Sequence, residues 1–349
     1  MRVLIVRLSS MGDLVHALPA ITDAASVHPT VRFDWAVDQT FSDVPSWHRA
    51  VDRIIQCPPR RKGSDFLQSL LTGKFSEFVR EIQETTYDLI IDLQGDFKGA
   101  IVTGLSRGVK FGFDAKSVRE WGAQWAYHKV GFVPREQHAI KRIRQLMAEA
   151  LSYPTPNNDP DYGIDRSRLP KVSLSYPSPY LVFIHSTSWA SKCWPVSCWQ
   201  DLTTLARTAG FFVVLPWGNQ KEKERAVLIA NQQEGVFVLP DLSISEKASI
   251  IAHAKGTVGC DTGLSHIAAA LDIPSVALYG ATDPALVGTT GENQKQMVSR
   301  FECVNCRHAK CTYTKPSLFS PACLVEITPE QVWETLQDLL SRQIATRSF

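Results

Sequence analysis

A single carboxylate, Asp13, follows the first apolar segment of the chain in "RLSSMGDLVHALPA" at residues 7–20. Residues 2–6, "RVLIV", predict a strand, and the apolar residues from Leu14 onward have helical spacing. A carboxylate at the end of a strand can act as a general base toward a bound ligand. Aspartate is also favoured at helix N-termini, so Asp13 equally suits a helix cap. Both interpretations stay open at this point.

A second strand–turn–helix segment is "GCDTGLSHIAAALDIP" at residues 259–274. Its turn holds Asp261, Thr262 and Gly263, and small residues there allow a ligand to approach the backbone. The N–H groups at the start of a helix attract anions, so a nucleotide diphosphate fits this turn. The alternative is an ordinary capped helix, in which His266 is a core histidine and not a phosphate contact.

Two further loops carry polar side chains at predicted strand ends. The loop "HSTSWASKCWP" at residues 185–195 is rich in hydroxyl groups, and Lys192 is its only charged residue. A lysine in such a loop suits a pyrophosphate leaving group. After the next predicted strand, Glu222 is placed to accept hydrogen bonds from a ribose, although other charges surround it.

Four of the eight cysteines are concentrated near the C-terminus with the spacing C-x₂-C-x₄-C-x₁₁-C. The first pair has the spacing of a metal knuckle, and four thiolates suit zinc or iron. Buried or free thiols and a redox role are the alternatives. The four residues are Cys303, Cys306, Cys311 and Cys323.

Short apolar strands alternate with helical patterns along the whole chain, which predicts parallel sheets in doubly wound α/β domains. A segment rich in Pro, Asn, Asp and Ser at residues 152–178 predicts a linker between two units of similar length. The predicted strands are 2–6, 32–37, 88–94, 180–186, 211–218, 235–240, 256–262 and 274–280, and the predicted helices are 77–86, 137–151, 197–210, 222–232, 243–254 and 328–343.

The net charge of +2 is too small to indicate nucleic-acid binding. Residues 104–144, however, contain nine lysines and arginines against three acidic residues, which indicates an anionic partner or a solvated basic face. The basic run 60–62 precedes a partly amphipathic stretch at 65–82, which suits either peripheral contact with an anionic membrane or a helix packed on its domain. No run approaches the ~18 apolar residues of a membrane span, so we expect a cytoplasmic protein.

Taken together, "MRVLIVRLSSMGDLVHALPA", "KCWP", "LPWG" and "DTGLSHIAAALDIPSVALYGATDP" resemble the lipopolysaccharide heptosyltransferases of glycosyltransferase family 9. The resemblance covers nearly the whole chain and is strongest to the heptosyltransferase I members. It implies the GT-B fold, α/β with two doubly wound Rossmann-like domains facing a cleft. The acceptor would bind to the N-terminal domain, residues 1–165. The ADP-sugar would bind to the C-terminal domain, residues 166–328. A C-terminal helix, 329–349, would pack back toward the N-terminal domain.

The resemblance also implies an activity, the inverting transfer of L-glycero-D-manno-heptose from ADP-heptose to the Kdo of Kdo-lipid A. This would occur without a catalytic metal, at the cytoplasmic face of the inner membrane. Asp13 would be the general base and Lys192 would stabilise the leaving group. The remaining implied residues are Thr187, Ser188, Glu222, Asp261, Thr262, Gly263 and His266 for the donor, and Arg60, Arg61, Lys98, Arg119 and Arg142 for the acceptor.

The four-cysteine segment departs from the simplest heptosyltransferase I pattern. Similar segments occur in heptosyltransferase II and in protein-modifying heptosyltransferases, one type of which binds iron. The acceptor therefore stays open between Kdo, phospho-Kdo, a first heptose and a protein. Two different functions also stay open, a nucleotide-sugar epimerase and a non-catalytic nucleotide-sugar-binding protein.

Overall fold

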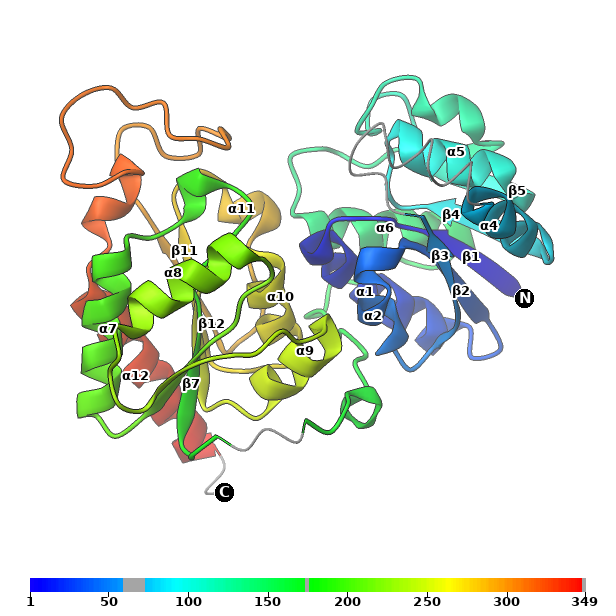
Figure 1. Cartoon of the computed structure of the whole chain (residues 1–349). Coiled ribbons are helices and arrows are strands. Elements are labelled where there is room, and N and C mark those ends of the chain that lie inside the picture. Colours follow the sequence, from blue (N-terminus) through cyan, green and yellow to red (C-terminus); the bar gives the residue numbers. More distant parts are fainter. Residues whose placement is uncertain (59–72, 173–175, 347–349) are drawn as a thin grey trace. The chain divides into compact units, whose positions relative to one another are not determined.

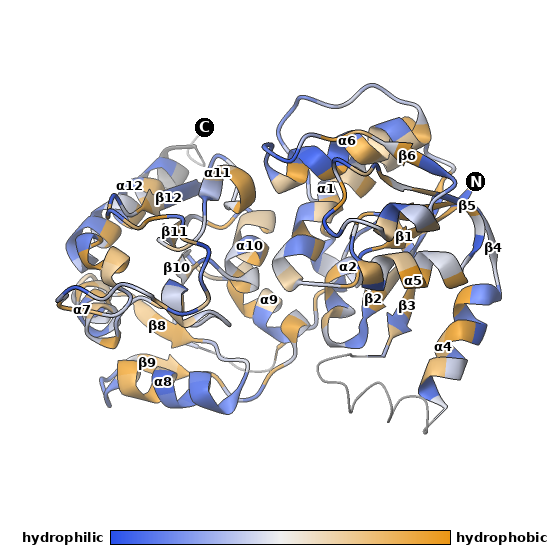
Figure 2. Ribbon diagram, turned by 90° about the horizontal axis from the view of Figure 1, so that it is seen from above, coloured by the Kyte–Doolittle hydropathy of each residue, from blue (hydrophilic) through white to orange (hydrophobic). Residues whose placement is uncertain are grey.

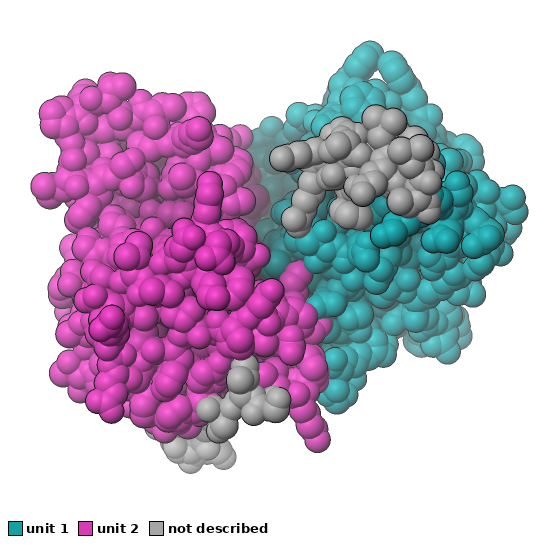
Figure 3. All heavy atoms as spheres, viewed as in Figure 1, with its two compact units in different colours: residues 1–168 teal, residues 169–349 magenta. Residues whose placement is uncertain are grey.

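The computed structural model describes residues 1–58, 73–172 and 176–346 (Figure 1). Contacts between residues divide the chain into two compact units, residues 1–168 and 169–349 (Figure 3). None of the helices in these described ranges has both the length and the apolar character that a membrane crossing requires.

Unit 1 contains a six-stranded sheet in the order β3-β2-β1-β4-β5-β6. All of its neighbouring strands are parallel. The strand order reverses between β1 and β4, and ligands of such sheets bind beyond the carboxyl ends of the strands at this switch point. The strands are β1 (Arg2–Val6), β2 (Arg32–Asp38), β3 (Val51–Cys57), β4 (Thr86–Asp92), β5 (Arg107–Phe113) and β6 (Lys129–Gly131).

The helices of unit 1 include α4 (Lys74–Gln83), on which hydrophobic and hydrophilic residues alternate (Figure 2). Its Phe78 and Ile82 are buried in the core with residues of β1 and β3. The described part of the amphipathic stretch therefore packs on its own unit, and residues 65–72 lie outside the described ranges. The other helices are α1 (Met11–Val27), α2 (Asp43–Ser46), α5 (Phe97–Leu105), α6 (Ala139–Leu151) and the 3₁₀ turns η1 (Gln39–Phe41), η2 (Ala123–Ala126) and η3 (Arg166–Arg168).

Unit 2 repeats the same design, with a parallel sheet in the order β12-β11-β10-β7-β8-β9. Here the order reverses between β7 and β10. The strands are β7 (Tyr180–Ile184), β8 (Phe212–Leu215), β9 (Val236–Val238), β10 (Gly256–Cys260), β11 (Ser275–Tyr279) and β12 (Gln294–Val298). The helices and 3₁₀ turns are η4 (Ala190–Lys192), α7 (Val196–Thr208), α8 (Gln220–Ala230), α9 (Ile244–Ala252), α10 (Gly263–Ala270), α11 (Pro284–Val287), η5 (Ala322–Glu326) and α12 (Pro329–Thr346).

Each strand and helix predicted from the sequence is present, with ends that differ by a few residues. The prediction missed the strands β3, β5, β6 and β12, the helix α5 and the short helices α2 and α11. Edge strands such as β12, "QKQMV", are largely exposed, so they lack the apolar run that marked the central strands.

One expectation about chain organisation is wrong. Much of the predicted linker is packed on unit 1, because the Asp165 N–H donates to the Trp47 carbonyl and Arg168 donates to the His48 carbonyl at 2.7 Å. The C-terminal helix α12 contributes Val332, Trp333, Leu336 and Leu339 to the core of unit 2. Its packing toward the N-terminal domain stays a prediction.

Candidate active site

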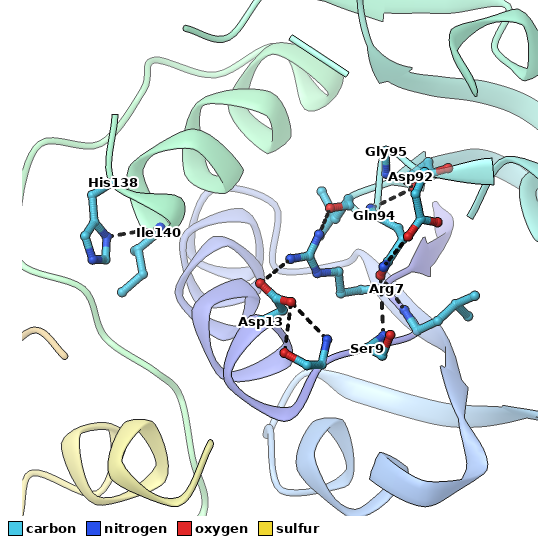
Figure 4. A network of polar contacts seen from close by, with 12 residues as sticks. Arg7, Ser9, Asp13, Asp92, Gln94, Gly95, His138 and Ile140 are labelled. Carbon is cyan, nitrogen blue, oxygen red and sulfur yellow. Dashed lines mark hydrogen bonds and ion pairs between the residues drawn. The ribbon is translucent and has the colours of Figure 1, made fainter. Parts of the chain in front are cut away.

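Asp13 lies in the first turn of α1, directly beyond the switch-point strand β1 (Figure 4). Its Oδ2 accepts hydrogen bonds from the Ser10 N–H at 2.9 Å and from the Ser10 hydroxyl at 3.0 Å. Its Oδ1 lies 2.9 Å from an Arg7 guanidinium nitrogen, and the side chain keeps 28% of its surface exposed. Asp13 thus caps the helix and also presents a carboxylate to solvent, so the two interpretations of its role are compatible.

The charge state of Asp13 follows from these contacts. Burial alone would raise its pKa, but the positive charge of Arg7, the Ser10 hydrogen bonds and His16 together lower the pKa to about 2. The carboxylate is therefore ionised at any physiological pH. A histidine pair lies close by, since the rings of His16 and His138 are 5.6 Å apart edge to face.

The loop between β1 and α1 is held by residues beyond β4 (Figure 4). The Gln94 side-chain oxygen accepts from the Leu8 N–H at 3.0 Å, and the Gln94 amide donates to Asp96 at 2.9 Å. Arg7 also donates to the Leu93 carbonyl. These partners lie 86 positions apart in the sequence, so nothing local to "RLSSMGD" could reveal them.

Asp92 in turn fixes the turn that carries Gln94. Its Oδ1 accepts from the N–H groups of Gln94 and Gly95, and its Oδ2 accepts from the Tyr127 hydroxyl at 2.9 Å. The side chain is fully buried, and this burial raises the pKa of Asp92 to about 6 despite those hydrogen bonds.

Positive charge gathers around the Asp13 loop. The Arg142 guanidinium donates to the Ser117 carbonyl at 2.8 Å and lies over the Phe113 ring. Burial, together with the nearby charges of Arg135 and Arg7, lowers the pKa of Arg142, so both of these cations lie close enough to repel Arg142. An anion bound here would relieve that repulsion. Sequence reasoning missed Arg7; its position at the carboxyl end of β1 was the available signal.

The other predicted acceptor residues are less connected. Lys98 lines a mainly apolar pocket together with Ser9, Asp38 and Ile101, next to the Asp13 loop. Arg119 is exposed on the segment after β5. Arg60 and Arg61 lie outside the described residues.

In unit 2, Asp261 follows β10 at the switch point and is the centre of a buried polar cluster. Its Oδ2 accepts from the Lys192 ammonium at 2.7 Å and from the Thr282 hydroxyl at 2.6 Å. Its Oδ1 lies 3.5 Å from the His266 imidazole. Burial would raise the pKa of Asp261, but the hydrogen bond from His266 and the charge of Lys192 lower it far below its usual value.

Lys192 ends the loop that follows β7, on the opposite side of the same switch point. Its ammonium lies over the Trp189 ring, 4.6 Å from the ring centroid. The neighbouring Ser191 is buried and donates from both its N–H and its hydroxyl to the carbonyls of Ala309 and His308. The Lys192 ammonium thus has a fixed position between an aromatic face and a carboxylate.

The remaining predicted donor residues surround this cluster. The Thr187 hydroxyl donates to the Asp261 carbonyl at 3.3 Å, and Ser188 follows it as an exposed residue. Thr262 and Gly263 begin α10, whose first N–H groups have no carbonyl partner within the helix. Glu222 lies one strand further on, beyond β8, where its carboxylate accepts from the Gly218 N–H at 2.7 Å.

Three of the four cysteines, Cys303, Cys306 and Cys311, belong to an irregular segment after β12, and Cys323 lies in η5. Burial, and then the charges of Cys303, Cys311 and Cys306, raise the pKa of Cys323 to about 11, so the four thiols are neighbours. Even so, within residues 1–58, 73–172 and 176–346 no group of three or more His, Cys, Asp or Glu side chains is arranged to hold a metal ion. The zinc or iron site that the spacing predicts stays a prediction.

The same irregular segment supports the donor loops through its backbone. The N–H groups of Asn305 and Arg307 donate to the carbonyls of Gly280 and Ala281, at 2.7 Å and 2.8 Å. Thr282, whose hydroxyl donates to Asp261, follows directly.

Comparison with known proteins identifies the family. The model of glycosyltransferase family 9 (heptosyltransferase) matches residues 75–316. Lipopolysaccharide heptosyltransferase 1 of Pseudomonas aeruginosa is 40% identical over 97% of this chain and 98% of its own length. The chain belongs to glycosyltransferase family 9.

Solved family 9 structures have the same fold along the whole chain. Escherichia coli heptosyltransferase WaaC with ADP aligns with a TM-score of 0.84 and 36% identity over 97% of this chain and 100% of that one. The same enzyme with ADP-2-deoxy-2-fluoro heptose gives 0.81 and 36% over 97% and 99%. The predicted fold class, GT-B with two doubly wound α/β domains, is thereby confirmed, and so is the prediction that this family 9 chain is an enzyme.

Proposed function

We propose that this enzyme transfers L-glycero-D-manno-heptose from ADP-heptose to the Kdo of the lipopolysaccharide inner core, with inversion at the anomeric carbon. The observation that carries the proposal is the ionised, partly exposed Asp13 carboxylate at the switch point of unit 1. The names of the family 9 relatives support the reaction type, and the solved relative with an ADP-heptose analogue supports the donor.

Asp13 supplies the base that an inverting transfer requires. A sugar hydroxyl is a poor nucleophile near neutral pH, and it loses its proton as it bonds to the anomeric carbon. A positioned carboxylate that accepts this proton contributes ~10²–10⁴-fold to the rate. Arg7 and the Ser10 N–H fix the orientation of the carboxylate and keep it free of a proton beforehand.

Lys192 and the start of α10 stabilise the leaving ADP. Negative charge develops on the pyrophosphate as the bond to the sugar breaks, and preorganised donors are most effective against such charge. Lys192 is held by Asp261 and Trp189, and the first N–H groups of α10 supply uncharged donors. Thr187, Ser188 and His266 complete the phosphate contacts, and Glu222 binds the ribose. These groups bind and stabilise the leaving ADP without a catalytic metal.

The cations of unit 1 favour an anionic acceptor, and Kdo carries a carboxylate. Lys98, Arg119 and Arg142 are the described residues that we propose to contact it. With a lipid-linked acceptor, the enzyme works in the cytoplasm at the inner membrane as a peripheral protein. The positive charge of unit 1 favours Kdo over heptose or a protein as the acceptor. It also favours glycosyl transfer over epimerisation or over binding without catalysis.

The test is an acceptor panel with purified enzyme and ADP-heptose. We expect turnover with a deacylated Kdo-terminated acceptor, and a product whose anomeric configuration by NMR is opposite to that of the donor. Turnover with a heptose-terminated core or a protein, and none with Kdo, would reassign the acceptor. A product with retained configuration would exclude the role of Asp13 as base.

A further inference from the structure

Exposed apolar side chains are concentrated in one stretch of unit 1. Of the thirteen large hydrophobic residues that are exposed in the described part of the chain, seven lie between Phe97 and Phe132. Trp121 and Trp125 are the extreme cases, at 68% and 73% exposed. Large aromatic side chains left in water mark an interaction surface more often than isolated exposed residues do.

Three of these aromatic rings form a single surface. The rings of Trp121 and Trp125 meet edge to face with 5.0 Å between centroids. A Cβ added to Gly122 would lie 3.3 Å from the Phe97 ring and 3.5 Å from the Trp125 ring, so Phe97 completes the group. Gly122 itself has a φ of +103°, a conformation that side chains disfavour, and this turn presents the two tryptophans. We call Phe97, Trp121 and Trp125 the aromatic surface.

The aromatic surface lies at the same edge of the sheet as Asp13. Phe97 begins the helix that follows β4, and the tryptophans follow β5, so all three lie beyond carboxyl ends of parallel strands. The Glu120 N–H donates to the Gly95 carbonyl at 3.0 Å, and the Glu120 carboxylate accepts from the Phe97 N–H at 2.9 Å. Gly95 is adjacent to Gln94, which holds the Asp13 loop.

Positive charge accompanies the aromatic surface. Lys98 is adjacent in sequence to Phe97, and Arg119 is adjacent to Glu120. Lys116 lies on the same segment as Arg119, and all three side chains are exposed. Indole rings favour the headgroup region of a bilayer, and lysine and arginine favour a surface with anionic lipids. This combination fits an anionic bilayer better than a second protein, whose interface would call for fewer unpaired charges at its centre.

We propose that the aromatic surface inserts into the headgroup region of an anionic bilayer and holds unit 1 there, with the Asp13 edge of the sheet facing the membrane. The role of this membrane contact rests on the proposed function, because the contact would bring a lipid-linked acceptor to Asp13. The contact itself rests on the aromatic surface and the positive charge beside it. Residues 74–82 are not part of this membrane contact, because α4 uses its apolar face in the core, and residues 65–72 lie outside the described residues.

The experiment compares wild-type enzyme with Trp121→Ala/Trp125→Ala in sedimentation with vesicles. Vesicles of phosphatidylethanolamine with phosphatidylglycerol are compared with vesicles of phosphatidylcholine alone. We expect wild type to bind the anionic vesicles at least about tenfold more tightly, and the double variant to lose about tenfold of that affinity. Raising the salt from low to high concentration should weaken wild-type binding. Lipids brominated near the headgroup should quench wild-type tryptophan emission and leave the variant nearly unquenched.

Leu318→Ala is the matched control, because Leu318 is 85% exposed but belongs to unit 2. It should bind vesicles as wild type does. Equal binding by wild type and the tryptophan double variant would overturn the proposal, as would wild-type self-association that the double variant abolishes, since the surface would then join two copies of the chain.

Turnover of the deacylated, water-soluble acceptor separates this proposal from the proposed function. The double variant should turn it over at the wild-type rate, because neither tryptophan belongs to the proposed catalytic groups. If wild type fails to use that acceptor but still binds vesicles through the tryptophans, the proposed function is wrong and the membrane surface stands. If turnover is normal and vesicle binding is absent, the reverse holds.

Discussion

Asp13 and Asp261 both lie at the switch points of their units, but on opposite sides of them: Asp13 follows the first strand of unit 1, β1, and Asp261 follows the fourth strand of unit 2, β10. Each follows a parallel strand at a switch point, each lies at the start of a helix, and each is paired with a cation at less than 3 Å. They differ in the exposed fraction of the side chain. Each carboxylate has a polar partner at both oxygens, but the Asp261 side chain is 6% exposed whereas the Asp13 side chain is 28% exposed. The first arrangement immobilises a lysine, and the second leaves a carboxylate that can react.

A substitution of Asp13 is the most direct test of the difference between the two carboxylates. Asp13→Asn keeps an oxygen for the Ser10 N–H but cannot take a proton, so we expect turnover to fall by at least ~10² while ADP affinity stays unchanged. Single-turnover kinetics and calorimetric titration with ADP measure the two quantities. Turnover within threefold of wild type would remove the base role and leave Asp13 as a helix cap.

The second prediction concerns the cation of unit 2. Lys192→Ala removes the donor that faces developing charge on the leaving group, so we expect kcat to fall by about 10² and ADP binding to weaken with it. Lys221→Ala is the control, because it removes an exposed lysine from the same unit. The comparison of the two units fails if ADP affinity and kcat both survive in Lys192→Ala.

Asp261→Asn sharpens the same comparison. The change leaves Lys192 without a charged partner but removes no group that would touch the phosphates directly. ADP binding should therefore weaken less than in Lys192→Ala. A larger loss than in Lys192→Ala would show that Asp261 does more than hold the lysine.

The sequence was more informative about unit 2 than about unit 1, for a physical reason. The loops of unit 2 carry their chemistry in short segments, since Thr187 and Lys192 lie in one loop and Asp261, Thr262 and His266 in another. The central strands were predictable because buried parallel strands are continuously apolar. In unit 1 the loop that leads to Asp13 is held by Leu93 and Gln94, each 86 positions from its partner in that loop. The strand β5, "RGVKFGF", mixes glycine and charge. Such long-range partners leave no local pattern.

A third carboxylate at a strand end, Asp92, extends the comparison to complete burial. Its native pKa is about 6, above its usual value of 3.8, because burial disfavours the charge. The unfolded chain ionises this group from about pH 4, while the native state keeps the proton until about pH 6. The stability that Asp92 contributes is therefore present at low pH and is lost as the pH rises from 4 to 6.

Asp92→Asn cannot ionise, so it should lack this dependence. We expect the free energy of unfolding of wild type, measured relative to Asp92→Asn, to decrease by on the order of 2–3 kcal/mol between pH 4 and pH 7.5. Denaturant unfolding of both proteins across that range gives the value. A constant difference between the two proteins would mean that Asp92 keeps an ordinary pKa in the folded enzyme.

The smallest effect on turnover is expected at the four cysteines, which belong to unit 2, the unit of Asp261. Residues 305–309 support the Gly280–Ala281 and Ser191 backbones, but no thiol reaches the Lys192–Asp261 cluster through a hydrogen bond that the described residues show. Exhaustive chelation should therefore leave kcat within threefold of wild type.

Elemental analysis of protein purified without chelator tests the predicted structural metal separately. One zinc or iron per chain would require the thiols to move together. Four titratable thiols with little metal would agree with their positions here. Loss of turnover on chelation that added Mg²⁺ or Mn²⁺ restores would place a metal at the pyrophosphate instead, and would end the metal-free account of how Lys192 and α10 stabilise the leaving group.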